Sequence, residues 1–360
     1  MDIQSLDWRP RIGAKTDYGI GCIGCGGIVQ YGHMPAYRKA GFRVVAAYDL
    51  KREAAEAVHA LTGGSATVYD SLDALLADPA VDIVDIAVMP WAQHEIVRKV
   101  AAAGKHMLCQ KPLSLDFDQA VDIVNLARDA GVKQAVNHQM RWDSGIAAAK
   151  LLIEQGAIGT PTDAQIQVGS ATPWHMWPWL ASAPRLEVQY HSIHYIDAMR
   201  FLFGMPEWLT SRHAKYAGQG NVKAETKTIT IMDYASGVQS MIAVNHYNMH
   251  GETYAVFRFY GTEGAIEGTI GLMYNYPSGR PDTLVYRQQG KDPIELPLDE
   301  MWIPDALVGP MAGLMSAIET GGLPPTDSAD NLNTLRLVEA AYLSASEHRS
   351  VALAGFLERR

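Results

Sequence analysis

The segment Tyr18–Val29 reads YGIGCIGCGGIV and decides the fold class of this 360-residue chain. Its first half is apolar at every position, as expected of a strand that is buried on both faces. The glycines that follow lie where this strand gives way to a helix, which is the context of a dinucleotide-binding loop. Such a loop brings backbone N–H groups and a helix N-terminus toward a pyrophosphate. The residues that we expect to contact it are Gly24, Gly26, Gly27 and Ile28. By itself the pattern is also typical of an ordinary strand–helix turn.

A carboxylate after the next strand strengthens this interpretation. The run Arg43–Tyr48 (RVVAAY) predicts a second buried strand, and Asp49 follows it, 23 positions beyond Gly26. A carboxylate at this point accepts a hydrogen bond from the adenosine ribose, and it repels a 2′-phosphate. The sequence therefore favours NAD over NADP, although Lys51 and Arg52 could pair with such a phosphate. The alternative role of Asp49 is the N-cap of a helix.

The pattern of elements changes near residue 140. Before it, apolar strands alternate with amphipathic helices, which predicts a parallel, doubly wound sheet covered on both faces. After it, strands follow one another with short polar turns, which predicts a large, open, mainly antiparallel sheet in an α+β domain. We expect a Rossmann domain over residues 16–140 and a substrate and oligomerisation domain over 141–330. A C-terminal helix over 331–360 is expected to pack back toward the Rossmann domain.

Composition excludes several classes of protein. The chain carries 30 Lys+Arg and 39 Asp+Glu, a net charge of −9, which disfavours nucleic acid as a partner. No run approaches the ~18 apolar residues of a membrane span. Three cysteines cannot form a disulfide framework and suit a reducing compartment, so we expect a cytoplasmic protein. Cys22 and Cys25 have the spacing of a redox or metal pair, but we interpret them as packing residues around the glycine loop.

Three further segments carry a family resemblance. They are Val81–Pro112, Glu187–Gly204 and Gly321–Leu353. Together with the glycine loop, and in the same order, they resemble the Gfo/Idh/MocA family of NAD(P)-dependent oxidoreductases over nearly the whole chain. The resemblance implies a Rossmann domain followed by a domain with an open antiparallel sheet.

The resemblance implies a catalytic lysine. The family's Glu-Lys-Pro motif, whose lysine reaches the nicotinamide ribose and the substrate, corresponds here to Gln110-Lys111-Pro112. An ammonium beside a substrate hydroxyl stabilises the developing alkoxide. Because Gln110 replaces a carboxylate, we expect Lys111 to lose its proton more easily. Pro112 makes a cis peptide possible. Without the family context, a lysine before a proline is more often a surface turn.

A second motif implies a catalytic histidine. The family's Asp-x-x-x-His-x-x-Asp appears here as Tyr190-x-x-x-His194-x-x-Asp197. His194 matches the proton-accepting histidine, and an imidazole suits base catalysis near neutrality. Asp197 shares its helical face and could orient the ring or bind a substrate hydroxyl. Tyr190 replaces the first Asp, and we expect it to be catalytic as well, because its phenol can still donate or accept a hydrogen bond.

Further candidates line the expected cofactor and substrate sites. The resemblance implies that Pro90, Trp91 and His94 lie against the cofactor, together with Gln110. It also matches Asn137 and Arg141, and Arg141 could contact substrate or brace the sheet.

The loop Thr172–Trp179 (TPWHMWPW) suggests an aromatic wall for a sugar ring. We therefore expect Trp174, His175 and His191 to bind substrate, although such a loop could equally be a core or interface plug. No metal is expected. His246 and His250 share a strand face but lie ~13 Å apart in extended chain.

These residues predict an NAD-dependent dehydrogenase of a small sugar or polyol. Oxidation of an aldose at C1 to a lactone is favoured, and pentose-sized or branched sugars such as apiose are possible substrates. One alternative is a redox-neutral, NAD-dependent glycosidase. Another is a non-catalytic NAD- or sugar-sensing protein, because Gln110 and Tyr190 replace two family carboxylates. The resemblance also implies a homodimer or homotetramer formed through the C-terminal sheet.

Overall fold

The computed structural model describes residues 6–357 and divides into two compact units. The parallel-sheet unit comprises Pro10–Gln139 and Ile303–Leu332. The antiparallel-sheet unit comprises Met140–Trp302 with the described residues before Pro10 and after Leu332. The division at residue 139/140 agrees with the change of pattern in the sequence. The expected C-terminal boundaries do not agree, because the chain returns to the parallel-sheet unit over Ile303–Leu332 before it completes the other unit.

The parallel sheet has the strand order of a dinucleotide-binding domain. Its order is β3-β2-β1-β4-β5-β6, with every neighbouring pair parallel. The strands are β1 (Gly19–Ile23), β2 (Arg43–Tyr48), β3 (Thr67–Val68), β4 (Ile83–Ile86), β5 (His106–Cys109) and β6 (Gln134–Val136). Strands β1 and β4 are buried at every position, as the apolar runs predicted.

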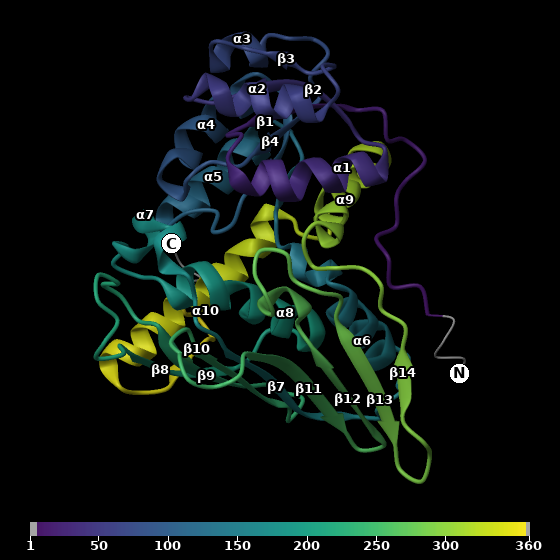
Figure 1. Cartoon of the computed structure of the whole chain (residues 1–360), viewed down its shortest axis with the longest axis vertical. Helices are drawn as coiled ribbons and strands as arrows, with labels where there is room; N and C mark the ends of the chain where they lie inside the picture. Colours follow the sequence, from purple (N-terminus) through teal and green to yellow (C-terminus); the bar gives the residue numbers. More distant parts are fainter. Residues whose placement is uncertain (1–5, 358–360) are drawn as a thin grey trace. The chain divides into compact units, whose positions relative to one another are not determined.

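Helices pack against this sheet (Figure 1). They are the π-helical turn η2 (Val29–His33), α1 (Met34–Ala40), α2 (Arg52–Leu61), α3 (Leu72–Leu76), α4 (Pro90–Ala102), α5 (Phe117–Asp129) and α9 (Val308–Thr320). Helix α9 packs against α1, β5 and β6, and the N–H of Val136 donates to the carbonyl of Thr326 at 2.9 Å. The sequence analysis missed α9, because Gly309 and Pro310 in its first turn mimic a loop.

The second sheet is antiparallel with one exception. Its order is β14-β13-β12-β11-β7-β10-β9-β8-β15, and only β7 and β10 are parallel neighbours. The strands are β7 (Pro161–Gly169), β8 (Trp208–Ala214), β9 (Lys227–Asp233), β10 (Gln239–Asn245), β11 (Tyr254–Gly261), β12 (Gly264–Thr269), β13 (Thr283–Gln288), β14 (Ile294–Leu296) and β15 (Val351–Ala352). The sequence analysis missed β8 and β15.

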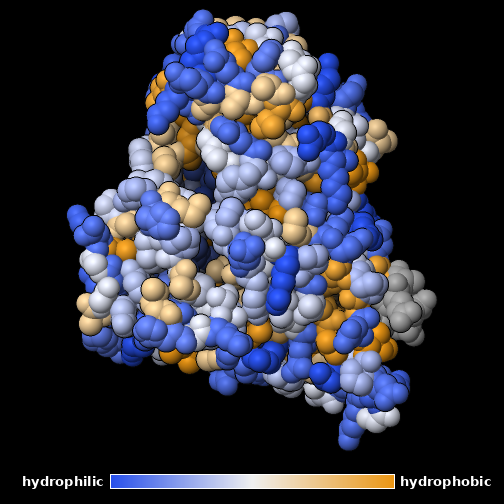
Figure 2. Space-filling model, viewed as in Figure 1, coloured by the Kyte–Doolittle hydropathy of each residue, from blue (hydrophilic) through white to orange (hydrophobic). Residues whose placement is uncertain are grey.

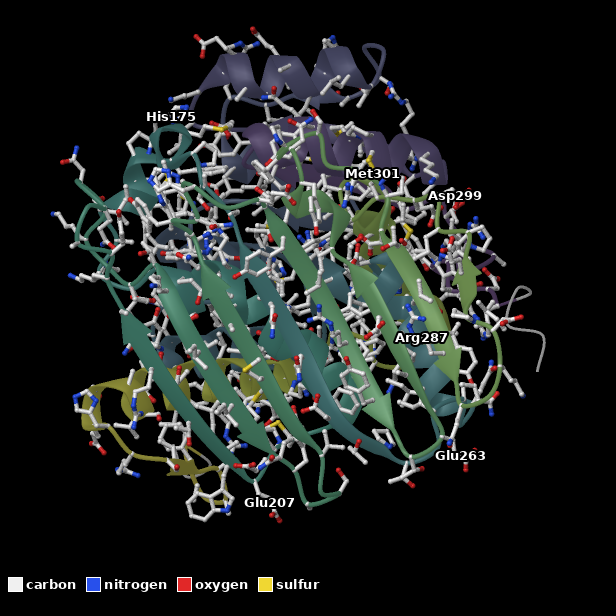
Figure 3. All side chains as sticks on the ribbon, turned by 60° about the horizontal axis from the view of Figure 1, so that its bottom comes forward. His175, Glu207, Glu263, Arg287, Asp299 and Met301 are labelled. Carbon is white, nitrogen blue, oxygen red and sulfur yellow. The ribbon has the colours of Figure 1, made fainter. Side chains whose placement is uncertain are left out.

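One face of this sheet is covered and the other is open. Strand β9 alternates strictly, with Thr228, Thr230 and Met232 buried while Ile229 and Ile231 on the opposite face are exposed. The helical elements of the unit are α6 (Ser144–Glu154), α7 (Pro178–Ala181), the π-helical turn η5 (Val188–Ser192), α8 (Ile193–Phe203) and most of α10 (Ser328–Glu347). Figure 3 looks onto the open face, which carries Arg287.

The C-terminal segment forms contacts within the antiparallel-sheet unit. Beyond Leu332, the segment is tied to the antiparallel-sheet unit. The hydroxyl of Ser344 accepts from the N–H of Ser211 at 2.8 Å, and Val351 pairs with Leu209.

Hydrophilic residues occupy most of the face drawn in Figure 2, where hydrophobic residues form separate patches. Between residues 6 and 357, no helix combines the length and apolar character needed to cross a membrane.

Candidate active site

Five strand ends of the parallel sheet meet in one row. Ile23 pairs with Tyr48 and Ile86, Ile86 pairs with Cys109, and Cys109 pairs with Val136. The residues that follow these positions therefore share the carboxyl edge of the sheet. They are Gly24, Asp49, Ala87, Gln110 and Asn137. Ligands of doubly wound sheets bind at this edge.

The glycine loop has the shape that a pyrophosphate requires. Gly24 has φ +82°, and a Cβ there would lie 2.6 Å from the carbonyl oxygen of Ala87, so glycine is needed for both backbone and space. Gly26 is exposed, and nothing lies within 4 Å of the position its Cβ would take. This open space lies directly before the helical turn η2. The loop therefore fits the phosphates of a dinucleotide.

Asp49 ties the end of β2 to this loop. Its Oδ2 accepts from the N–H of Cys25 at 2.7 Å, and its Oδ1 accepts from the N–H of Lys51 at 2.8 Å. Lys51 is the N-cap of α2, so Asp49 is not the helix cap that the sequence left open. The half-buried carboxylate retains lone pairs for a ribose hydroxyl. Arg52 pairs with Glu56 and with Asp70 and is thereby drawn away from a 2′-phosphate.

The lysine loop is held by amide side chains. Gln110 Oε1 accepts from the N–H of Lys111 at 3.0 Å, and Gln93 Nε2 donates to the carbonyls of Pro112 at 2.8 Å and Leu113 at 3.3 Å. The Lys111–Pro112 peptide is cis. Burial lowers the pKa of Lys111 to about 7. The pKa moves in the direction expected from the loss of the family carboxylate, but desolvation is its cause.

The residues expected against the cofactor begin α4. Pro90 is its first residue, and Trp91 is 60% exposed. His94 is engaged elsewhere, because its Nε2 lies 2.5 Å from Asp122 Oδ2 on α5. That contact joins two helices and gives His94 a structural partner.

The three cysteines are buried free thiols. Burial raises the pKa of Cys25 and of Cys109 to about 12, so neither thiol ionises readily near neutrality. This agrees with packing rather than redox chemistry. Among the described residues, no group of three or more His, Cys, Asp or Glu side chains could hold a metal ion.

Helix α8 carries His194 in the antiparallel-sheet unit. The buried ring of His194 meets Trp302 edge to face at 5.2 Å between centroids. One turn later, Asp197 accepts from Arg141 Nε at 2.6 Å and Nη2 at 2.8 Å, and also from the hydroxyl of Thr334 at 2.7 Å. This buried bidentate pair favours the bracing role for Arg141 over substrate contact.

The aromatic loop before α8 forms a small core. Trp174 and Tyr190 are both buried, and Tyr190 meets Trp179 edge to face at 5.5 Å. They belong to a cluster with Leu180, Ala181, Leu186, Val222 and Ala224. Burial raises the pKa of Tyr190. The expected aromatic wall is thus largely packing, which is the alternative that the sequence left open.

The parallel pair β7–β10 gathers polar rings at one end of the sheet. Gly169 pairs with Asn245, so the segments that follow both strands lie together. His246 approaches His191 at 4.6 Å and Trp174 at 5.3 Å between ring centroids. His175 is exposed, and Figure 3 shows it at the end of the sheet opposite Glu207.

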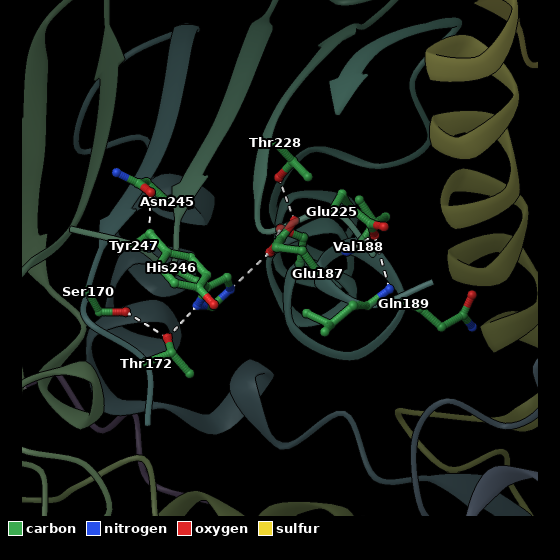
Figure 4. Close-up of polar contacts among 12 residues, drawn as sticks. Ser170, Thr172, Glu187, Val188, Gln189, Glu225, Thr228, Asn245, His246 and Tyr247 are labelled. Carbon is green, nitrogen blue, oxygen red and sulfur yellow. Dashed lines mark hydrogen bonds and ion pairs between the residues drawn. The ribbon is translucent and has the colours of Figure 1, made fainter. Parts of the chain in front are cut away.

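A buried carboxylate anchors the start of this helical segment (Figure 4). Glu187 accepts from the hydroxyl of Ser192 at 2.6 Å and from that of Thr228 at 2.5 Å, and His246 Nε2 lies 3.8 Å away. Glu225 likewise accepts from the N–H of Leu186 at 3.1 Å. Two carboxylates thereby hold the π-helical turn η5 that leads into His194.

Three buried polar residues around these segments were not predicted from the sequence: His33, Asp85 and Glu187. His246 was considered only as a metal ligand, and its buried contacts were not predicted. Asp85 lies within an apolar run, and the partner of His246 depends on which strands pair. Only the presence of charge or imidazole at buried positions could have indicated them.

Comparisons with known proteins agree with this architecture. The model of an oxidoreductase family with an NAD-binding Rossmann fold matches residues 18–138, and the GFO/IDH/MocA C-terminal domain matches residues 146–267. D-apiose dehydrogenase from Paraburkholderia graminis is 30% identical over 336 residues, which cover 92% of this chain and 88% of that protein. The 1,5-anhydro-D-fructose reductase of Ensifer adhaerens is 27% identical, with 88% and 92% covered.

A solved structure extends the likeness to the whole fold. An oxidoreductase from Agrobacterium radiobacter, in complex with NAD+, L-tartaric acid and magnesium, superposes with a TM-score of 0.82 at 25% identity. The match covers 95% of this chain and 100% of that chain. The chain therefore belongs to the Gfo/Idh/MocA family of oxidoreductases and carries its NAD-binding Rossmann domain.

Proposed function

We propose that the protein is an NAD-dependent dehydrogenase that oxidises a hydroxyl of a small sugar or polyol. The observation that carries the proposal is the row at the carboxyl edge of the parallel sheet. It places the open glycine loop, the carboxylate of Asp49 and the segment Gln110–Lys111 on one edge. Two relatives named D-apiose dehydrogenase and one named 1,5-anhydro-D-fructose reductase support a sugar as the substrate class.

Each group has a distinct role in this proposal. Bound NAD supplies the hydride acceptor. The loop at Gly24 and Gly26 holds the pyrophosphate, and Asp49 accepts from the ribose. His194 takes the proton of the substrate hydroxyl, and the Lys111 ammonium stabilises the oxyanion that this creates. Because its pKa is about 7, Lys111 also exchanges a proton readily near neutrality.

The favoured reaction is oxidation of an aldose at C1 to a lactone. Pentose-sized and branched sugars such as apiose are the first candidates, as the names of two relatives suggest. We assign substrate contacts to His191 and His175, with Trp174 as supporting wall. Tyr190, Asp197 and Arg141 have buried partners that suit a frame around His194.

The test is a panel of aldoses and polyols, offered with NAD and with NADP in parallel, with reduced nicotinamide followed by its absorbance. Asp49 predicts a preference for NAD. Lys111→Met should lower kcat by about 10²–10³-fold, as expected when a preorganised oxyanion donor is lost. Calorimetric titration with NAD should show unchanged affinity. Near-normal turnover in this variant would refute the assignment of Lys111.

A second candidate is redox-neutral chemistry on a sugar, with NAD retained. One relative, 2,7-anhydro-N-acetylneuraminate hydratase from Escherichia coli, is named as a hydratase and is 28% identical over 55% of this chain. Glycoside cleavage without net accumulation of reduced nicotinamide would favour this candidate over a dehydrogenase. Tight NAD binding without turnover of any sugar would instead favour a sensing protein.

The open sheet face is the proposed surface of self-association. Trp208, Ile229, Ile231 and Tyr254 are each at least 40% exposed there, as expected for a face that a second copy covers. Light scattering after size exclusion should give a dimer or tetramer, and Ile229→Lys with Ile231→Lys should give a monomer. We place the protein in the cytoplasm, where its three free cysteines would stay reduced.

A further inference from the structure

A chain of buried polar groups runs beneath the carboxyl edge of the parallel sheet. It begins at Asp85 on β4, which is 1% exposed. Asp85 Oδ2 lies 2.6 Å from Nδ1 of His33, on the π-helical turn η2, and accepts from the hydroxyl of Tyr37 at 2.8 Å. His33 is also 1% exposed. A carboxylate this deeply buried needs such donors, so Nδ1 of His33 carries a proton.

The second ring nitrogen of His33 points to the lysine loop. His33 Nε2 lies 3.2 Å from Asn137 Nδ2 and 3.4 Å from Gln110 Nε2. The orientation of the Gln110 amide is fixed independently, because its Oε1 accepts from the N–H of Lys111 at 3.0 Å. Gln110 therefore presents N–H to His33, and His33 Nε2 accepts. The ring is the neutral tautomer with its proton on Nδ1.

We propose that Asp85 and His33 are positioning residues for Lys111. Asp85 fixes the tautomer of His33, His33 fixes the amide of Gln110, and Gln110 fixes the backbone N–H of Lys111. Gln93 holds the loop from the other side through the carbonyl of Pro112. The inference rests on the proposed role of Lys111 in oxyanion stabilisation. A displacement of about 1 Å at such a group costs on the order of 100-fold in rate.

The glutamine at position 110 matches this neutral histidine. A glutamine offers N–H to the lone pair of His33 Nε2, whereas a glutamate would place an acceptor against an acceptor. Gln110→Glu therefore removes the donor that faces His33 Nε2. The carboxylate-to-amide replacement thus has a partner within this protein, His33. His33 in turn contacts Asp85 and Asn137, and Tyr37 donates to Asp85.

Two substitutions at His33 separate its contact with Asp85 from its contact with Gln110. In His33→Asn, the amide nitrogen takes the place of Nδ1, which keeps a donor to Asp85 and removes the contact with Gln110. In His33→Gln, the amide reaches toward Gln110 and the donor to Asp85 is lost. The control is Tyr37→Phe, which removes one donor to Asp85 and leaves the path to Lys111 intact.

We expect His33→Asn to lower kcat at least about tenfold and to shift its pH profile, with NAD affinity unchanged. Gln110→Leu should likewise lower kcat and shift the pH profile without disturbing a buried charge, so the proposal can still be tested if His33→Asn does not fold. Tyr37→Phe should lower Tm and keep kcat. Wild-type kcat and an unshifted pH profile in both His33→Asn and Gln110→Leu would overturn the proposal.

The tautomer of His33 can be measured without substrate, so it tests the proposed network independently of activity. Heteronuclear NMR of the imidazole nitrogens should show the proton of His33 on Nδ1 in the wild type, with Nε2 accepting from Gln110. A proton on Nε2 in the wild type would overturn the proposed network whatever the activity. If the tautomer is as expected and Lys111→Met remains fully active, the proposed function fails while the network stands.

Discussion

The two units stabilise their buried charges in different ways. Around α8, Asp197 is fixed by the two N–H groups of Arg141, and Glu187 is fixed by hydroxyls of the sheet and its own helical turn. Beneath the edge of the parallel sheet, Lys111 has a pKa of about 7, and a histidine shares its proton environment with a single carboxylate. The difference teaches that dedicated donors hold the carboxylates around α8, whereas burial alone lowers the pKa of Lys111 into the neutral range.

The largest expected effect is the loss of the buried pair of Arg141 and Asp197. Arg141→Ala leaves Asp197 buried without its bidentate partner, and breaking a buried pair costs about 3–5 kcal/mol. Urea denaturation measures this loss. As a control, Arg287→Ala removes an exposed partner of Glu267 and should cost at most about 1 kcal/mol. Equal losses in the two variants would contradict the distinction between a buried frame and surface pairs.

The next effect concerns the exchangeable proton of Lys111. Its pKa in the folded protein, about 7, is below the 10.5 of an unperturbed lysine. The charged form is therefore destabilised by folding: the penalty is fully present below pH 7 and disappears as the pH rises toward 10.5. Lys111→Met should accordingly raise the free energy of unfolding at pH 6 by a few kcal/mol at most, and Tm should rise with it. The difference in stability between the variant and the wild type should disappear toward pH 10.

The exposed lysine Lys223 gives the control for this experiment. Lys223→Met should change Tm little, and by the same amount at both pH values. A pH-independent gain in Lys111→Met would mean that better packing, rather than the removal of a desolvated charge, stabilises the variant.

A smaller effect tests the hydroxyls that hold Glu187. Thr228→Val keeps the shape of the side chain but removes a donor to a buried carboxylate, which should cost about 1–3 kcal/mol in chemical denaturation. The matched control is Thr210→Val, because Thr210 Oγ1 contacts Ser350 Oγ in a half-exposed position and not a buried carboxylate. If both variants lose the same stability, Glu187 is not the anchor that its geometry indicates.

The smallest effect concerns Asp49, the half-buried carboxylate that follows β2 at the carboxyl edge of the parallel sheet. Asp49→Asn keeps an acceptor for the N–H of Cys25 but removes the negative charge. The ratio of kcat/KM with NAD to that with NADP should fall by about tenfold, one lost charge repulsion of roughly 1.4 kcal/mol. An unchanged ratio would assign cofactor choice to other residues.

The parallel sheet and the glycine loop could be predicted because their signals are local. Strands β1 and β4 are buried runs, and the loop follows β1 directly, whereas the short strand β3 (Thr67–Val68) has no such signal and was not predicted. The environment of His246 could not be predicted, because it depends on the parallel pairing of β7 with β10. These strands are neighbours in the sheet, although β8 and β9 lie between them in the sequence. The buried role of Asp85 could not be predicted for another reason. Its hydrogen-bond partners, Tyr37 and His33, lie in a different segment of the sequence, and the residues around Asp85 form an apolar run.

The return of Ile303–Leu332 to the parallel-sheet unit constrains how the protein is made. On the ribosome, the first 139 residues emerge without α9, and the surfaces of β5, β6 and α1 that this helix covers stay uncovered. A Cβ at Gly32 would lie 2.8 Å from Leu307 Cδ1, so the segment Ile303–Leu332 packs closely against the helical turn that contains Gly32. The dinucleotide-binding unit can therefore mature only after most of the chain has been synthesised, and a fragment that ends near residue 140 should depend on chaperones and aggregate.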